Sequence, residues 1–152
     1  PALVIAGTFA KIEEVPLEVI YASSVETGEG DASHLTDGDL GTIWHTMYSV
    51  TLAKYPHWVD FDAAAVKTMK GFVYTPRTDG PNGRVKDFEI DVSNDAKNWS
   101  EPVCKGSFQN SGEPQRVLFA KPVKARYIRF RALNEQGGND YASGAEFNLI
   151  AE

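Results

Sequence analysis

Short apolar segments, each followed by turn-forming residues, recur along most of the chain of 152 residues. In several of them apolar residues alternate with charged or polar ones, as in Phe88-Ile90-Val92 and from Tyr127 to Arg131. A period of two is typical of a β-strand with one buried face, because successive side chains point to opposite sides. The best helix candidate, residues 63–70, is too short and too rich in β-branched residues. We therefore expect a chain built from strands.

The expected strands lie at residues 17–23, 57–62, 68–76, 86–93, 102–108, 115–121, 125–133 and 144–151. Between them, segments such as 76–84 and 134–144 are rich in Gly, Pro, Asn and Asp, which favour turns. This alternation predicts an all-β fold, an antiparallel β-sandwich of the jelly-roll type. Residues 1–15 stand apart as an N-terminal linker or an extra strand, which leaves 16–152 as one domain.

Charge and composition exclude several classes of function. The sequence holds 15 Lys and Arg residues against 21 Asp and Glu residues, a net charge of −6. This balance argues against nucleic-acid partners and against docking on anionic lipid, both of which need clustered cations. No run of 18 apolar residues occurs, so no membrane insertion is expected. The single Cys104 rules out an internal disulfide and is expected to pack in a core.

The segment HLTDGDLGTIWHT, residues 34–46, is dense in oxygen-bearing side chains. Asp37 and Asp39 flank Gly38, and Thr42 follows. Calcium takes six to eight oxygen ligands, and a turn with glycine lets backbone carbonyls point inward. The spacing differs from that of an EF-hand, which has a 12-residue loop ending in Glu. On residue types alone a plain acidic turn is the simpler interpretation.

Three other segments carry side chains suited to a polyhydroxylated ligand. They supply Trp44, His45 and Tyr48; Arg77, Asp79, Asn82 and Arg84; and Asn139, Asp140 and Tyr141. Proteins recognise sugars with an aromatic ring on the C–H face and polar side chains on the hydroxyls. A structural interpretation competes with this one. Trp44 has apolar neighbours and is expected in the core, while Trp58 and Trp99 are expected in the core or at a sandwich end.

With these segments in view, the chain resembles the discoidin-like or coagulation factor 5/8 type C domain family. It is most similar to the bacterial branch of family 32 carbohydrate-binding modules. The resemblance rests on DGDLGTIWHT, YPHWVDFD, KGFVYTPR, PNGRVKDFEIDVSNDAKNW, ARYIRFRALNE and YASGAEFNL, which occur in the family's order and cover residues 17–151. It implies a galactose-binding-like sandwich of eight strands and a structural calcium ion beneath the binding loops.

The resemblance also implies roles for individual residues. The calcium ligands would be the carbonyls of His34, Asp39, Thr42 and Ala145, the carboxylates of Asp37 and Glu146, and the Thr42 hydroxyl. The sugar would meet His45, Arg77 and Asn82 at an axial hydroxyl, Tyr141 as an aromatic wall, and Tyr48 as a second face. Many relatives have Trp or Phe in place of Tyr141. Glu26 and Glu29 are both candidates for an additional acidic contact.

The function implied is that of a non-catalytic carbohydrate-binding module. It would recognise terminal galactose or N-acetylgalactosamine-type sugars and target an attached glycoside hydrolase to glycans. Its partners would be those glycans and the catalytic domain of the same parent polypeptide, and the isolated module would be a monomer. A bacterial location that is secreted, periplasmic or on the cell surface follows.

Two other classes of function compete with this one. The alternative is a structural or protein-interaction module of a larger secreted enzyme, without sugar binding of its own. An enzyme is disfavoured because glycoside hydrolysis needs two positioned carboxylates. The acids available here are assigned to calcium, as Asp37 and Glu146, or to turns.

Overall fold

The computed structural model of the chain describes residues 2–7 and 15–152. These ranges contain nine strands and one short 3-10 helix. The elements are β1 (Leu3–Ala6), β2 (Glu18–Ala22), η1 (Ala32–Thr36), β3 (Trp44–His45), β4 (His57–Thr75), β5 (Asp87–Ser93), β6 (Cys104–Ser107), β7 (Gln115–Ala132), β8 (Ser143–Gly144) and β9 (Glu146–Ala151). No helix in the described ranges is long and apolar enough to cross a membrane.

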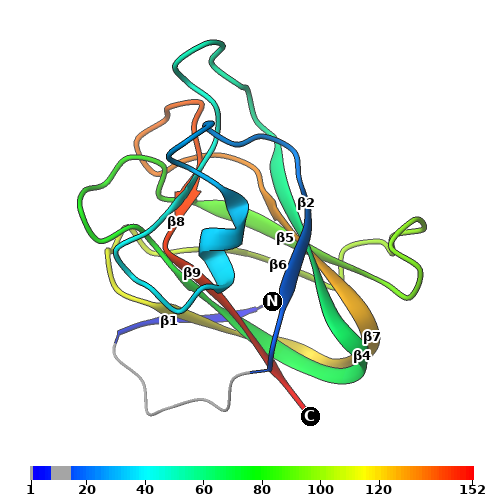
Figure 1. Cartoon of the computed structure of the whole chain (residues 1–152). Helices are drawn as coiled ribbons and strands as arrows, with labels where there is room; N and C mark the ends of the chain where they lie inside the picture. Colours follow the sequence, from blue (N-terminus) through cyan, green and yellow to red (C-terminus); the bar gives the residue numbers. More distant parts are fainter. Residues whose placement is uncertain (1, 8–14) are drawn as a thin grey trace.

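Two long strands, β4 and β7, run antiparallel beside each other and shape the whole fold (Figure 1). Their register shifts between Asp62 and Lys67, where Ala64 has a φ of 67°, and β4 turns a corner there. Before the corner β4 pairs with β2 and with the last part of β7, which continues to β5 and β6. After the corner β4 pairs with β9 and with the first part of β7, which also pairs with β1. One hydrogen-bonded sheet therefore supplies both layers of a sandwich.

The all-β antiparallel sandwich that the sequence predicts is confirmed, but the strand count differs. The expected strands 57–62 and 68–76 are one strand, and so are 115–121 and 125–133, because the backbone pairing continues around the corner. The described residues add the short strands β1, β3 and β8. The described residues therefore form nine strands, where the resemblance implies eight.

Aromatic side chains fill the space between the two layers. Phe61 of β4 stacks on Phe147 of β9, with ring centroids 4.5 Å apart and planes at 11°. Phe72 meets Phe88 of β5 edge to face, with centroids 5.4 Å apart and planes at 89°. All four rings are buried, and such pairs contribute roughly 0.5–1.5 kcal/mol each beyond the burial of their area. The apolar positions of the alternating segments thus face this core.

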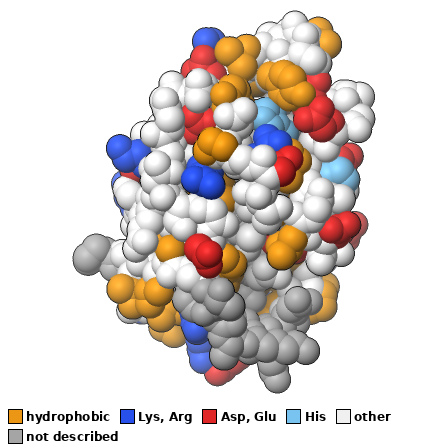
Figure 2. All heavy atoms as spheres, turned by 90° about the vertical axis from the view of Figure 1, so that its left-hand side faces the viewer, with side chains coloured by type: hydrophobic (Ala, Val, Ile, Leu, Met, Phe, Trp, Pro, Cys, Tyr) orange, Lys and Arg blue, Asp and Glu red, His pale blue; other side chains and the backbone are white. Residues whose placement is uncertain are grey.

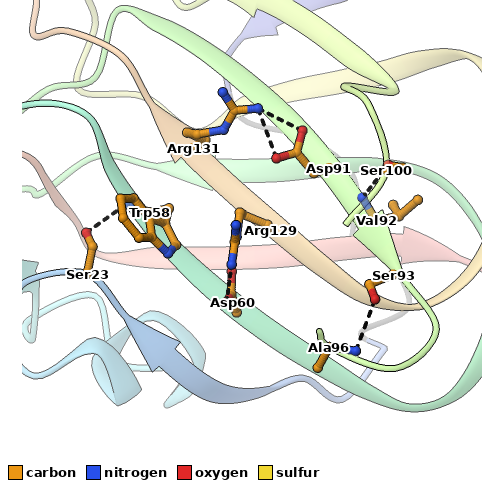
Figure 3. A network of polar contacts seen from close by, with 10 residues as sticks. All are labelled: Ser23, Trp58, Asp60, Asp91, Val92, Ser93, Ala96, Ser100, Arg129 and Arg131. Carbon is orange, nitrogen blue, oxygen red and sulfur yellow. Dashed lines mark hydrogen bonds and ion pairs between the residues drawn. The ribbon is translucent and has the colours of Figure 1, made fainter. Parts of the chain in front are cut away.

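The outer face of the first layer carries charged side chains in register, which occupy the polar positions of the same alternation (Figure 3). Its ion pairs are Asp60 with Arg129, Asp62 with Arg126, Asp91 with Arg131 and Glu89 with Arg131. The Arg129 guanidinium lies 5.5 Å from the ring centroid of Trp58 and 4.3 Å from that of Trp99. Trp58 and Trp99 are therefore half-buried beside Arg129 on this outer face, and neither packs in the core.

Other residues lie where the sequence suggested. Trp44 is fully buried, and its indole Nε1 donates to the Ser24 carbonyl over 3.0 Å. Cys104 is buried too, and burial raises the pKa of its thiol to about 11. Leu3–Ala6 forms a strand on β7, whereas residues 1 and 8–14 lie outside the described residues, so the boundary near residue 15 stays a prediction.

Replacing Phe72 tests the dependence of the fold on the aromatic core. Phe72→Ala removes a ring that touches residues of both layers, so the free energy of unfolding should fall by about 3–5 kcal/mol. Leu3→Ala is the control, because Leu3 is 55% exposed and its loss should cost within about 0.5 kcal/mol. Urea denaturation followed by tryptophan fluorescence measures both, and equal losses would contradict this account of the core.

Candidate functional site

A hollow of about 310 Å³ lies among the loops that follow β2, β3, β4 and β7. Its lining consists of Glu29, His45, Tyr48, Leu52, Arg77, Asn82 and Tyr141. The structure therefore brings together all five residues that the sequence nominates for a sugar site, and their role in binding stays a prediction. On the face shown in Figure 2, a histidine side chain lies beside cationic and acidic side chains, with hydrophobic ones around them.

His45 reaches the hollow from a short strand anchored in the core. Strand β3 pairs with β8, with Trp44 opposite Gly144 and His45 opposite Ser143. The His45 ring is almost fully buried, and its Nδ1 lies 2.7 Å from the Thr46 carbonyl oxygen. Because a carbonyl only accepts, Nδ1 must carry the hydrogen, which leaves Nε2 of the neutral ring as an acceptor. His45 is therefore set up to accept a hydrogen bond from a hydroxyl.

Arg77 is held in place by Asp79 of the same loop. Its Nε donates to Asp79 Oδ1 over 2.6 Å and its Nη2 to Oδ2 over 3.0 Å. This bidentate pair raises the pKa of Arg77 and lowers the pKa of Asp79 through the same hydrogen bonds. The Nη1 amino group takes no part in the pair, so it can donate to a ligand.

Asn82 lies at a tight contact with β8. Its backbone carbonyl accepts a hydrogen bond of 2.6 Å from Ser143 Oγ, and the Ser143 amide donates to the Gly83 carbonyl over 2.9 Å. Gly83 has a φ of 86°, and a Cβ there would collide with Ser143. Glycine therefore lets the loop approach β8 closely. The exposed side chain of Asn82 lines the hollow.

Two tyrosines flank the His45 ring. The ring centroid of Tyr48 lies 4.9 Å from that of His45 at 71°, and the centroid of Tyr141 lies 5.5 Å away at 39°. The Tyr48 hydroxyl donates to the Glu29 carboxylate, whose Oε1 and Oε2 lie 3.1 and 2.9 Å from the hydroxyl oxygen. This hydrogen bond raises the pKa of Tyr48. Both aromatic faces that the resemblance implies are therefore next to the histidine.

The structure separates the two acidic candidates of the ETGEG segment. Glu29 is exposed and lines the hollow. Glu26 is buried and accepts hydrogen bonds from the Tyr48 amide, 2.8 Å, and from the amide and hydroxyl of Ser49. The hydrogen bond from the Ser49 hydroxyl is the main reason that the pKa of Glu26 is lowered. Glu29 is placed to contact a ligand, whereas Glu26 holds the loop that carries Tyr48.

Sequence reasoning missed Leu52, which adds an apolar surface to the hollow from the loop before β4. The sequence gave no signal for it, because exposed leucines are common on protein surfaces. Asp140, which the sequence grouped with Tyr141, forms an ion pair with Lys54 at 2.6 Å instead. Arg84, grouped with Asn82, points its guanidinium to Asn110. Asp140 and Arg84 therefore hold loop segments together and do not line the hollow.

The expected calcium ligands also gather in one place. Thr42 Oγ1 donates to Asp37 Oδ2 over 2.6 Å and lies 3.1 Å from the Asp39 carbonyl oxygen. The Gly38 amide donates to Glu146 Oε1 over 2.8 Å, which joins this turn to the start of β9. The Asp39 carboxylate accepts from the Gly41 amide through Oδ1, 2.7 Å.

The chemistry of this oxygen cluster fits a divalent cation. Glu146 accepts from the amide of Gly38, the residue after Asp37, so the two carboxyl groups are neighbours. Neighbouring carboxyl groups are accommodated by a shared proton or by a bound cation. Burial would raise the pKa of Asp37, but the hydrogen bonds from Thr42 and Asp39 outweigh it and lower the pKa. The described residues hold no cluster of three His, Cys, Asp or Glu side chains suited to a metal, so carbonyl oxygens must complete any shell here. Of the remaining expected ligands, His34 lies in η1 and Ala145 directly precedes Glu146.

Comparison with known proteins gives consistent relatives. The sialidase of Micromonospora viridifaciens is 38% identical over 146 residues, which cover 93% of this chain and 22% of the relative. A galactose oxidase of Gibberella zeae is 32% identical over 134 residues, which cover 86% of this chain and 19% of the relative. The chain therefore spans less than a quarter of either curated relative.

Solved structures of high similarity are carbohydrate-binding modules from Clostridium perfringens. The module CpGH89CBM32-5, in complex with GalNAc-β-1,3-galactose, has a TM-score of 0.83 and 30% identity, covering 91% of this chain and 100% of that chain. The family 32 module of NanJ, in complex with galactose, has a TM-score of 0.79 and 28% identity, covering 90% and 96%. The model of the F5/8 type C domain matches residues 19–147. The chain therefore belongs to the F5/8 type C domain family, in its branch of family 32 carbohydrate-binding modules.

Proposed function

We propose that this domain is a non-catalytic module that binds terminal galactose or N-acetylgalactosamine-type sugars and targets an attached glycoside hydrolase to glycans. The observation that carries the proposal is the convergence of His45, Arg77 and Asn82 with two tyrosine rings in one hollow. A pyranose presents hydroxyls on its rim and an apolar C–H face, and this set of side chains matches both. The galactose bound by the similar NanJ module supports the choice of sugar.

The polar groups have complementary roles toward one hydroxyl. His45 Nε2 accepts its hydrogen, while Arg77 Nη1 and the Asn82 amide donate to its oxygen. An axial hydroxyl projects from the sugar ring into such a convergent set, whereas the equatorial epimer leaves the buried histidine without a partner. An unsatisfied buried polar group costs about 1–3 kcal/mol, which favours the galacto configuration.

The charges of the hollow favour neutral sugars. The positive charge of Arg77 is offset by Asp79, while the Glu29 carboxylate accepts a hydrogen bond from the neutral Tyr48 hydroxyl. A sugar carrying a carboxylate or sulfate beside Glu29 would be repelled. We therefore expect uncharged terminal sugars as ligands.

The open hollow also sets the scale of affinity and explains the need for a partner domain. One monosaccharide buries few atoms, so we expect a Kd between millimolar and high micromolar, roughly −4 to −6 kcal/mol. Weak binding becomes useful when the module is tethered to an enzyme, because tethering raises the local concentration near the substrate. The small share of each relative that the chain covers supports a catalytic domain in the same polypeptide. Glycan substrates of this kind favour a secreted, periplasmic or surface location.

Titration with sugars tests the sugar site. Galactose, N-acetylgalactosamine and lactose should bind, glucose at least tenfold more weakly, because one misplaced hydroxyl costs about 1.4 kcal/mol or more. His45→Ala and Arg77→Ala should each abolish measurable binding in calorimetry, with the thermal transition retained. Arg126→Ala, on the outer face of the sheet, should bind as the wild type. A protein that binds none of these sugars and is blank on a glycan array would be the structural module instead.

We also propose that a structural calcium ion occupies the oxygen cluster. Asp37, Glu146, the Thr42 hydroxyl and the carbonyls of His34, Asp39, Thr42 and Ala145 would hold it. The ion would supply positive charge beside the neighbouring carboxyl groups of Asp37 and Glu146. These ligands come from η1, from the turn after it, and from Ala145 and Glu146 where β9 begins, so they connect the segment leading to His45 with the last strand.

Removing calcium tests this site. Chelation should lower the melting temperature, because an ion at 100 times its Kd stabilises the folded state by about 2.7 kcal/mol. Glu146→Gln should be insensitive to added calcium, whereas Glu113→Gln, at an exposed turn, should respond as the wild type. Identical melting curves with calcium and with chelator would exclude a structural ion.

A further inference from the structure

Glu135 is a buried carboxylate between two loops of the hollow, in the segment between β7 and β8. Its Oε2 accepts from the Gly83 amide over 2.6 Å. Its Oε1 accepts from the Asn139 amide over 3.0 Å and from Asn139 Nδ2 over 2.7 Å. Glu135 belongs to none of the ion pairs found in the described part of the chain. A negative charge is thus kept in the interior by neutral donors.

Such a group has a strong preference for one arrangement. A buried charge is costly unless each of its oxygens is hydrogen-bonded, and hydrogen bonds from N–H groups to a carboxylate are stronger than neutral ones. Since each oxygen of Glu135 serves a different loop, displacement of either loop leaves part of the charge unsatisfied. The side chain therefore links the positions of the two loops.

The loops that Glu135 joins carry two walls of the hollow. Gly83 directly follows Asn82, and Asn139 precedes Tyr141 by two residues. The Gly83 end of the link is also fixed to Ser143, which pairs with His45 across β3 and β8. Glu135 itself does not line the hollow.

We propose that Glu135 is a positioning residue of the sugar site, which sets Asn82 and Tyr141 at the separation that a pyranose requires. The inference rests on the proposed function and adds a residue that does not touch the ligand. The groups that contact Glu135 are the Gly83 amide, the Asn139 amide and Asn139 Nδ2, and all of them are hydrogen-bond donors. The role therefore needs two acceptor oxygens on one side chain.

This requirement distinguishes a carboxylate from its amide. Glutamine has the same shape but only one acceptor oxygen, and its NH₂ group would face a donor of Gly83 or Asn139. Glu135→Gln must therefore release one of the two loops whichever way the amide is turned. A role limited to filling space would be preserved by this substitution.

The test compares Glu135→Gln with the wild type by amide hydrogen exchange and by titration with galactose. We expect the Gly83 or Asn139 amide to exchange at least tenfold faster, while the core amides of Val59 and Phe130 keep their protection. Galactose affinity should fall about tenfold. The exposed Glu101→Gln is the matched control and should change neither exchange nor affinity.

Each outcome decides the proposal. Faster exchange with unchanged galactose affinity overturns the positioning role, and so does unchanged exchange at both amides. If Glu135→Gln does not fold, Asn139→Ala replaces it, since it removes the Nδ2 donor alone. That variant should lose affinity by a smaller factor, and unchanged affinity overturns the proposal. If the wild type binds no sugar, the proposed function fails, and the exchange data still show whether Glu135 links the loops.

Discussion

The pairing of β4 with β7 is the interaction on which the rest of the structure depends. Both strands bend at one corner, so the same pair of hydrogen-bonded strands provides the centre of each layer (Figure 1). The corner brings Phe61 over Phe147 and Phe72 over Phe88, and it thereby creates the core. The ends of these strands also deliver the site, because Arg77 follows the end of β4 at Thr75 and Glu135 follows the end of β7 at Ala132. Core and hollow thus share one frame.

At the end of the sandwich, buried carboxylates hold the loops in place by accepting hydrogen bonds from backbone amides. Several apolar residues of the loops around the hollow, among them Tyr48, Val50 and Leu52, are exposed, so packing alone does not fix these loops. Glu26 accepts amide hydrogens of the loop with Tyr48, Glu135 those of two further loops, and Glu146 that of Gly38. Glu26 and Glu135 are satisfied by neutral donors, while Glu146 lies beside Asp37 at the site proposed for calcium. The acidic composition, which argues against anionic partners, is therefore partly a means of ordering loops.

The sequence predicts some of this and not the rest for physical reasons. Alternation reveals Phe88-Ile90-Val92 as a strand because the solvent and the core impose a period of two. It does not reveal that residues 63–66 continue a strand, since a corner interrupts the pattern. The order of the motifs predicts His45, Arg77 and Asn82 as one set of site residues. Residue type alone cannot decide whether Glu26 or Glu29 lines the site. The sequence does not predict the roles of Glu135 and Leu52, because these roles depend on contacts with loops that are distant in the sequence.

Rigidity matters more for this hollow than additional contacts would. A monosaccharide offers few atoms, so the free energy lost in ordering a mobile loop would consume much of the roughly −4 to −6 kcal/mol expected from binding. Asp79 holds Arg77, and Thr46 fixes the tautomer of His45, before any ligand arrives. In the same way, Glu135 fixes the spacing between the loops that carry Asn82 and Tyr141, because its buried carboxylate is hydrogen-bonded to both loops. A weak module with the proposed preference for one epimer needs its polar groups placed in advance, and the buried carboxylates Glu26 and Glu135 hold the loops that carry them.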